Sequence, residues 1–175
     1  MNTDIKKYIR TVKDFPKPGI MFRDITTLLK EPEGLKASFN ALLEFTKGLK
    51  IDKVVGIESR GFMLAAMIAE KLNAGFVPIR KPGKLPAETV REEYSLEYGT
   101  DSIEIHKDAI RPGETVLLHD DLLATGGTAQ AAVNLIEKLG GKVVQVSFII
   151  ELSFLNGREK LKGYDVRSLV SYESE

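Results

Sequence analysis

Apolar residues along the chain follow two alternating spacings, one typical of strands and one of helices. Short runs dominated by Val, Ile and Leu predict strands, and they cover residues 53–58, 76–80, 114–120, 142–151 and 165–170. Apolar residues spaced three or four apart predict helices between these runs, over residues 31–49, 60–73 and 127–140. Near-continuous apolar strands that alternate with helices indicate an α/β fold, with a central, mainly parallel sheet covered by helices on both faces.

Three segments depart from this rhythm. Residues 3–13 predict a short helix capped by Thr3, and residues 15–26 read as an irregular arm with two Pro and one Gly. Residues 81–107 are polar, with Pro and Gly at one end and alternation later, which predicts an antiparallel two-stranded excursion outside the core. We expect a single domain over residues 1–175, in which about 1–50 form an N-terminal hood and about 81–100 form a flexible lid.

Composition restricts the classes of function. The chain has 175 residues, which suits one domain with a sizeable core. It has 25 basic and 25 acidic residues, so it lacks the charge typical of nucleic-acid binding. There is no Cys, which excludes disulfides and thiolate chemistry. The longest apolar run, residues 62–69, is too short to cross a bilayer, and the N-terminus lacks an apolar signal core. We expect a cytoplasmic protein without a nucleic-acid or membrane partner.

The stretch VLLHDDLLATGGTA, residues 116–129, carries the clearest chemical signal. It places Asp120 and Asp121 at the end of a predicted buried strand, just before a Gly-rich turn that opens a helix. Ligands of parallel sheets bind beyond the carboxyl ends of the strands, and free N–H groups at a helix N-terminus bind phosphate. Neighbouring strand residues point to opposite faces, so both carboxylates can serve one ligand only where the strand gives way to the loop. A phosphorylated sugar fits such a site.

A second turn and a basic cluster add cations. Ser59, Arg60 and Gly61 fall between a predicted strand and the next helix, and Arg80, Lys81 and Lys84 follow the strand after it. The signature GxxxxGK[ST] of a P-loop and the dinucleotide pattern GxGxxG are both absent from the chain.

These motifs resemble those of the type I phosphoribosyltransferases. VLLHDDLLATGGT is similar to their binding motif for phosphoribosyl pyrophosphate (PRPP), and its ending is most similar to that of the adenine-specific members. FPKPGIMFRDIT, GIESRGF, IRKPGKLP and YSLEYG resemble further segments of those enzymes in the right order, so the resemblance covers nearly the whole chain. One departure is His119, where the family's strand is usually apolar, and we assign it no catalytic role.

The resemblance implies transfer of the phosphoribosyl group from PRPP to N9 of adenine, giving AMP and pyrophosphate, with Mg²⁺ held mainly by PRPP. It implies Arg60, Asp120, Asp121 and Glu97 as catalytic residues. The two Asp would hold the ribose hydroxyls and stabilise positive charge on the ribose. The 5′-phosphate would lie on Ala124, Thr125, Gly126, Gly127 and Thr128, and pyrophosphate on Ser59, Arg60, Arg80, Lys81 and Lys84.

Recognition of the base rests on the arm and the lid. In the enzymes for 6-oxopurines an Asp occupies the position of Ala124 and handles the N7 proton, so another acid is needed here. The resemblance implies Glu97 for this role and Tyr98 for closing the lid. It implies that Met21, Phe22, Arg23 and Leu123 contact adenine. The sharp turn at Glu58–Ser59 predicts a cis or otherwise strained peptide bond, and the resemblance implies a homodimer in which Arg80 reaches the neighbouring site.

Two alternatives stay open. A phosphoribosyltransferase for another base, such as xanthine or orotate, would share the PRPP motif. A regulatory protein that binds PRPP without catalysis would share it too, but about 50 residues without a helix-turn-helix pattern precede the first core strand.

Overall fold

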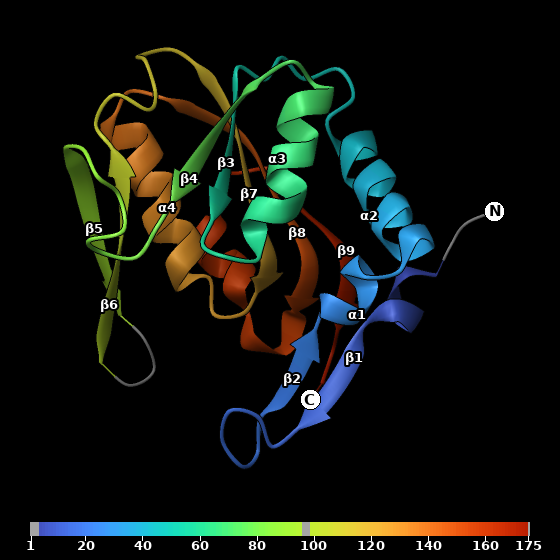
Figure 1. The fold of residues 1–175 in the computed structure, drawn as a ribbon. Helices are drawn as coiled ribbons and strands as arrows, with labels where there is room; N and C mark the ends of the chain where they lie inside the picture. Colours follow the sequence, from blue (N-terminus) through green and yellow to red (C-terminus); the bar gives the residue numbers. More distant parts are fainter. Residues whose placement is uncertain (1–3, 96–98, 175) are drawn as a thin grey trace.

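A five-stranded parallel sheet forms the centre of the molecule (Figure 1). The structure is a computed structural model that describes residues 4–95 and 99–174. The strand order is β4–β3–β7–β8–β9, and every neighbouring pair is parallel. The strands are β3 (Lys53–Ile57), β4 (Gly75–Ile79), β7 (Thr115–Leu123), β8 (Lys142–Leu152) and β9 (Val166–Tyr172). The predicted α/β class and its parallel sheet are therefore confirmed.

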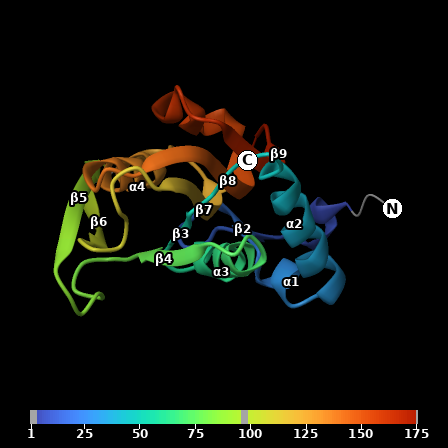
Figure 2. The same cartoon turned by 90° about the horizontal axis from the view of Figure 1, so that it is seen from above.

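Helices cover both faces of this sheet (Figure 2). On one face, α2 (Pro32–Phe45) and α3 (Gly61–Lys71) pack on a cluster that includes Leu117. On the other, α4 (Gly127–Lys138) packs on a cluster that includes Leu118. Consecutive residues of β7 thus enter opposite cores, which explains why its sequence is continuously apolar. In residues 4–95 and 99–174, no helix is long and apolar enough to span a membrane.

The connections make a switch point between β3 and β7. The chain passes from β3 through α3 to β4 on one side, and from β7 through α4 to β8 on the other. A crevice therefore opens at the carboxyl ends of β3 and β7. The two strands also differ in length, because their pairing ends at Gly56 and His119 while β7 continues along β8 to Leu123. The predicted strand end at residue 120 was therefore three residues too early.

The N-terminal segment differs from the prediction. The expected helix over 3–13 is wrong: a 3₁₀ turn, η1 (Ile5–Tyr8), is followed by β1 (Arg10–Lys13). Asp4 accepts the capping hydrogen bond from the Lys6 N–H, and Thr3 lies outside the described residues. The arm over 15–26 is not wholly irregular, because it contains β2 (Met21–Asp24), which pairs with β1, and the start of α1 (Thr26–Leu29).

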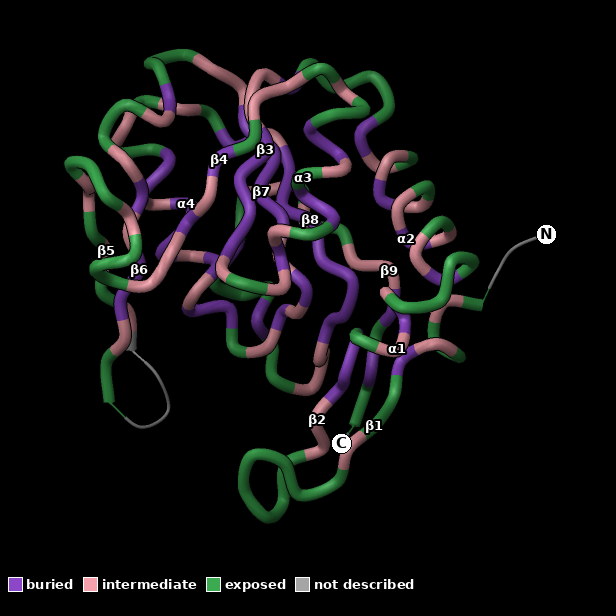
Figure 3. Tube along the Cα trace, viewed as in Figure 1, coloured by how far each residue is buried: buried purple, intermediate pink, exposed green. Residues whose placement is uncertain are grey.

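A cross-strand pair explains the hairpin of β1 and β2. Arg10 and Asp24 are register partners, and the Arg10 Nε donates to Asp24 Oδ2 at 3.1 Å. A charged pair fourteen residues apart leaves no periodic signal in the sequence. Figure 3 shows the connection between the two strands as exposed and the central strands as buried.

Residues 81–107 contain the predicted antiparallel excursion, formed by β5 (Thr89–Ser95) and β6 (Thr100–His106). The expectation that this segment stays outside the core is wrong for its inner side. Ile103 and Ile105 of β6 are buried in the same cluster as Leu118. Glu92 of β5 also pairs with Lys138 of α4, so α4 holds the base of the hairpin. After β8, two 3₁₀ turns follow, η2 (Ser153–Leu155) and η3 (Gly157–Leu161).

Leu118 tests the core beneath α4. Its side chain is fully buried in the central strand β7. We expect Leu118→Ala to lower the free energy of unfolding by about 2–5 kcal/mol, because it removes apolar contacts and leaves a cavity. Urea denaturation measures this change. Leu49→Ala, at an exposed position, is the control and should shift the midpoint little. Equal effects of the two substitutions would contradict this description of the core.

Candidate active site

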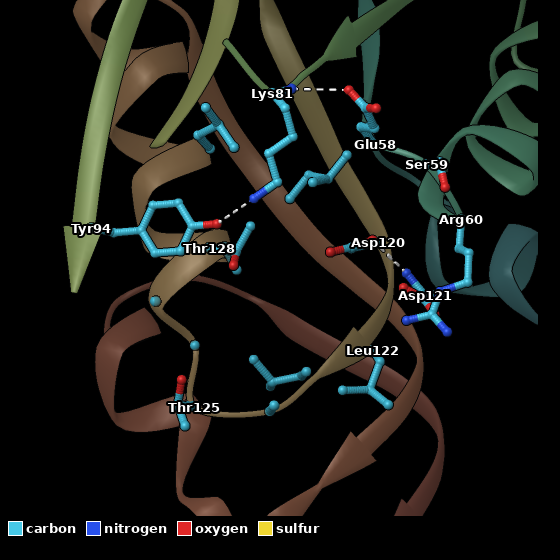
Figure 4. A pocket seen from close by; sticks show the side chains of 17 residues that line it. Glu58, Ser59, Arg60, Lys81, Tyr94, Asp120, Asp121, Leu122, Thr125 and Thr128 are labelled. Carbon is cyan, nitrogen blue, oxygen red and sulfur yellow. Dashed lines mark hydrogen bonds and ion pairs between the residues drawn. The ribbon is translucent and has the colours of Figure 1, made fainter. Parts of the chain in front are cut away.

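A cavity of about 260 Å³ lies at the switch point, beyond the carboxyl ends of β3 and β7 (Figure 4). Four segments that are distant in sequence meet there: residues 57–60 at the end of β3, Lys81 after β4, residues 120–129 across the end of β7 and the start of α4, and the β5–β6 hairpin. Its walls include Ser59, Arg60, Lys81, Tyr94, Asp120, Asp121, Leu123, Ala124, Thr125, Gly126, Gly127 and Thr128. The structure thus brings together both motifs that the sequence singled out.

The loop at residues 124–128 presents backbone donors to this cavity. The loop ends at the N-terminus of α4, whose first N–H groups have no partner within the helix and carry a partial positive charge. Gly126 has a φ of 78°, a left-handed conformation that favours glycine. Such a loop can bind a phosphate group.

A second segment, missed by the sequence analysis, supports this loop. A Cβ atom at Gly157, the first residue of η3, would lie 2.2 Å from the Ala124 carbonyl oxygen. The backbones of η3 and the loop therefore touch directly. Arg158 fixes η3 to the sheet, because its Nε and Nη2 donate to the buried carboxylate of Glu151 at 2.6 Å each.

The two carboxylates of β7 point to different sides of the strand, yet both line the cavity (Figure 4). The sequence predicts that one ligand reaches both only beyond the strand's end. The structure corrects this, because β7 continues past both residues. The early end of β3 explains the shared access: beyond His119, none of the described residues pairs with β7 on that edge, and the cavity opens there.

Burial and proximity make these carboxylates hard to ionise. Burial and the adjacent charge of Asp121 raise the pKa of Asp120 well above its usual range. Burial also raises the pKa of Asp121, although Arg60 opposes the shift. Arg60 Nε lies 2.9 Å from Asp121 Oδ2. A bound cation or positive charge near Asp120 would therefore be strongly favoured.

Arg60 also connects the cavity to the N-terminal hairpin. Its guanidinium carbon lies 5.0 Å from the centre of the Phe22 ring, a distance typical of a cation–π contact. Phe22 in turn packs edge-on against Phe15 at 5.1 Å. Phe22 and Arg60 line a second, more open pocket beside the first. One arginine thus contacts both a carboxylate of the cavity and an aromatic residue of the arm.

The turn after β3 has the backbone that its sequence predicted, since the Glu58–Ser59 peptide is cis. The Glu58 side chain, missed by the sequence analysis, holds the neighbouring segment. Its Oε2 accepts from Arg80 Nε at 3.1 Å and from the Lys81 backbone N–H at 2.9 Å. The Arg80 guanidinium is thereby engaged outside the cavity lining, whereas Lys81 lies in the lining.

Other predicted residues have different positions. Lys84, Met21 and Arg23 are not in the cavity lining, within the residues that the structure describes. Arg23 is buried: its Nη1 donates to Thr11, and its guanidinium carbon lies 4.0 Å from the centre of the Tyr172 ring. Glu97 and Tyr98 lie outside the described residues.

His119 is a buried residue of the sheet. Its Nδ1 lies 2.9 Å from Ser147 Oγ on β8, and burial lowers its pKa to about 4. The ring is therefore neutral near pH 7, and the cavity lining does not include it. That His119 has no catalytic role stays a prediction from the sequence.

Asp120→Asn tests the charge strain at the site. The folded-state pKa of Asp120 is raised above the unfolded value, so the folded protein binds its proton more tightly and loses stability as pH rises. Asn removes this penalty and can still accept the hydrogen bond that Asp120 Oδ1 receives from the Asp121 N–H. We expect the variant's Tm at pH 8 to rise by about 2–4 °C, a modest gain for a domain of this size.

Asp24→Asn is the matched control for this measurement. A hydrogen bond with Thr26 and another with Arg10 hold the pKa of Asp24 at about 2, below the unfolded value. Its contribution is present above the unfolded pKa and disappears as pH falls through the folded one. Asp24→Asn should therefore lower the Tm at pH 8. If both variants lower it, Asp120 is not under charge strain.

Known proteins with related sequences and structures identify the family. Residues 26–171 match the phosphoribosyl transferase domain family. The adenine phosphoribosyltransferase of Christiangramia forsetii is 60% identical over 97% of this chain and 99% of its own length. The crystal structure of the Thermoanaerobacter pseudethanolicus enzyme of the same name is 52% identical, with a TM-score of 0.95 over 98% of this chain and 100% of that one.

A Saccharomyces cerevisiae adenine phosphoribosyltransferase is also similar in structure. It was crystallised with an imino-altritol bisphosphate and adenine, and it is 40% identical, with a TM-score of 0.89 over 97% of this chain and 98% of that one. The family match covers most of the chain, and the Christiangramia and Thermoanaerobacter relatives share more than half of its residues. This chain therefore belongs to the type I phosphoribosyltransferase family, among its adenine phosphoribosyltransferases.

Proposed function

We propose that the cavity at the ends of β3 and β7 is where the chain transfers the phosphoribosyl group of PRPP to N9 of adenine. One observation carries this proposal: a carboxylate pair, a helix N-terminus and two cationic side chains line the same cavity. Each part matches one part of PRPP, which has a ribose, a 5′-phosphate and a pyrophosphate.

The loop at residues 124–128 binds the 5′-phosphate through its N–H groups and the hydroxyls of Thr125 and Thr128. Asp120 and Asp121 accept hydrogen bonds from the ribose hydroxyls. As the bond to pyrophosphate breaks, positive charge develops on the ribose, and the two carboxylates stabilise it. A positive charge beside the pair lowers both pKa values and offsets the repulsion between the carboxylates, so a cationic sugar is a favourable partner.

Pyrophosphate leaves toward Ser59, Arg60 and Lys81. Arg60 and Lys81 line the cavity and can neutralise the leaving group, and Arg80 and Lys84 extend this basic region outside the lining. The oxygen atoms available at the site also suit Mg²⁺, since diphosphate oxygens and the Asp120 carboxylate are hard ligands. When bound with PRPP, Mg²⁺ would add positive charge at the leaving group.

Adenine binds between the cavity and the N-terminal arm. Leu123 lies in the cavity lining, and the contact of Phe22 with Arg60 brings the arm to the same place. Met21 and Arg23 contribute backbone groups, which can accept from a 6-amino group and leave a 6-oxo group unpaired. We assign the N7 proton to Glu97, because Ala124 cannot carry it, and closure over the ligand to Tyr98.

We also propose a homodimer. Met63 of α3 and Phe76 of β4 are exposed, and β4 is an edge strand of the sheet. Phe62 stacks edge-on against Phe76, with ring centres 5.7 Å apart, so these apolar side chains form one surface. Arg80 follows β4 directly, which is consistent with a role at the neighbouring subunit's site.

Assaying different bases tests the activity. The purified chain should form AMP and pyrophosphate from PRPP and adenine with Mg²⁺ present. It should form no nucleotide with xanthine or hypoxanthine, because the arm rejects a 6-oxo group, and none with orotate, a pyrimidine without the 6-amino group that the arm reads. Chromatography of labelled PRPP products measures this. Turnover of another base would support a different specificity, and PRPP binding without turnover would support a regulatory protein.

The double substitution Asp120→Asn, Asp121→Asn tests the carboxylate pair. We expect kcat/KM for PRPP to fall by about 10²–10³ or more, because both charges that stabilise the ribose cation are lost. Steady-state kinetics on the folded variant measure the loss. Asp52→Asn is the control. Asp52 accepts a hydrogen bond from the Thr115 N–H at the amino-terminal ends of β3 and β7, away from the cavity, so this change should affect stability rather than kcat/KM. A fall of less than about tenfold would contradict the assigned role.

A further inference from the structure

Lys81 is held at both ends by groups that the sequence did not connect with it. Its backbone N–H donates to Glu58, as described above. Its ammonium donates to the Tyr94 hydroxyl at 3.2 Å and to the Asp101 carboxylate, while the Tyr94 hydroxyl donates to Asp101 Oδ2 at 3.1 Å (Figure 4 shows the contact with Tyr94). Tyr94 and Asp101 are register partners across β5 and β6. The hairpin thus presents a ready-made acceptor site to Lys81.

We propose that Asp101 is an internal counter-ion for Lys81, which an incoming pyrophosphate must displace. This inference rests on the proposed function, in which Lys81 binds pyrophosphate. Lys81 and Tyr94 line the cavity, whereas Asp101 lies behind them and is not part of the lining. The pair therefore neutralises the cation that the leaving group needs. Asp101 is a positioning residue, because it acts on the ligand through Lys81.

The charges of both groups support a formed ion pair. Burial works to lower the pKa of Lys81, but its bonds with Asp101 and Tyr94 outweigh burial and raise it. Burial works to raise the pKa of Asp101, but the bond and charge of Lys81, the Ser102 N–H and the Tyr94 hydroxyl together outweigh it and lower the pKa. Both groups are therefore charged near pH 7. A pyrophosphate in the cavity competes with Asp101 for the same ammonium and is repelled by its carboxylate.

Competition of this kind lowers the affinity for pyrophosphate. Because Asp101 stays beside Lys81, the ion pair between them can form again when the product leaves. The ion pair between Lys81 and Asp101 also connects the loop after β4 to the hairpin. When it breaks, one contact between two walls of the cavity is lost. Ligand binding and the attachment of the hairpin are then linked through a single lysine.

The test is the affinity for magnesium pyrophosphate, measured by calorimetry on the full chain. We expect Asp101→Asn to bind it about two- to fivefold more tightly, the range for a partly exposed ion pair. A purely structural role would weaken binding or leave it unchanged, since a loosened hairpin cannot improve the site. Glu92→Gln is the matched control: it removes a carboxylate of the same hairpin whose partner, Lys138, lies on α4. Its affinity should equal that of the wild type.

Two further variants complete the design. Asp101→Ser removes the charge with a smaller side chain and should also tighten binding, so the test does not depend on one variant folding. In the Lys81→Met background, Asp101→Asn should lose most of its effect, because no ammonium remains to release. Equal or weaker binding in both Asp101 variants, or tightening that persists without Lys81, would overturn the proposal. If the wild type forms AMP in that case, the proposed function stands and only the counter-ion role fails.

Discussion

The early end of β3 determines where this molecule can bind a ligand. β7 pairs with β3 only as far as His119, and within the part of the chain that the structure describes its next residues have no strand on that side. The edge left open carries two adjacent carboxylates, and the turn after β3 places Ser59 and Arg60 across from them. Gly61 lets α3 begin close to β7, because a Cβ there would lie 2.9 Å from the His119 carbonyl oxygen. If β3 were as long as β7, the sheet would close over the cavity.

Charge is distributed unevenly around this opening. The charge of Asp121 raises the pKa of its neighbour Asp120, and Arg60 opposes the raised pKa of both residues without cancelling it. The same Arg60 contacts Phe22, so one arginine links the carboxylate pair to the N-terminal arm.

The sequence was informative where a feature is local. The Val- and Ile-rich runs predicted the parallel sheet, and the Asp-Asp and Gly-Gly pattern predicted the carboxylates and the phosphate loop, because each depends on neighbouring residues. Features that depend on distant pairs were missed. The hairpin of β1 and β2 depends on Arg10 and Asp24, and the orientation of Lys81 depends on Glu58 and Asp101. The end of β7 was placed too early because it is set by β8, which extends beside it to Leu152. The length of a neighbouring strand cannot be predicted from any pattern within residues 114–120.

The contact between Gly126 and Gly157 has a consequence for how this site can change over time. A Cβ at Gly126 would lie 2.4 Å from the Gly157 carbonyl oxygen, and one at Gly157 would lie even closer to the loop. Replacing either glycine alone forces the other backbone away, and no second substitution at its partner restores space, because glycine is already the smallest residue. Any larger side chain at either position therefore displaces the loop at residues 124–128. The connection between β1 and β2 is exposed instead, so larger side chains there do not meet this restriction.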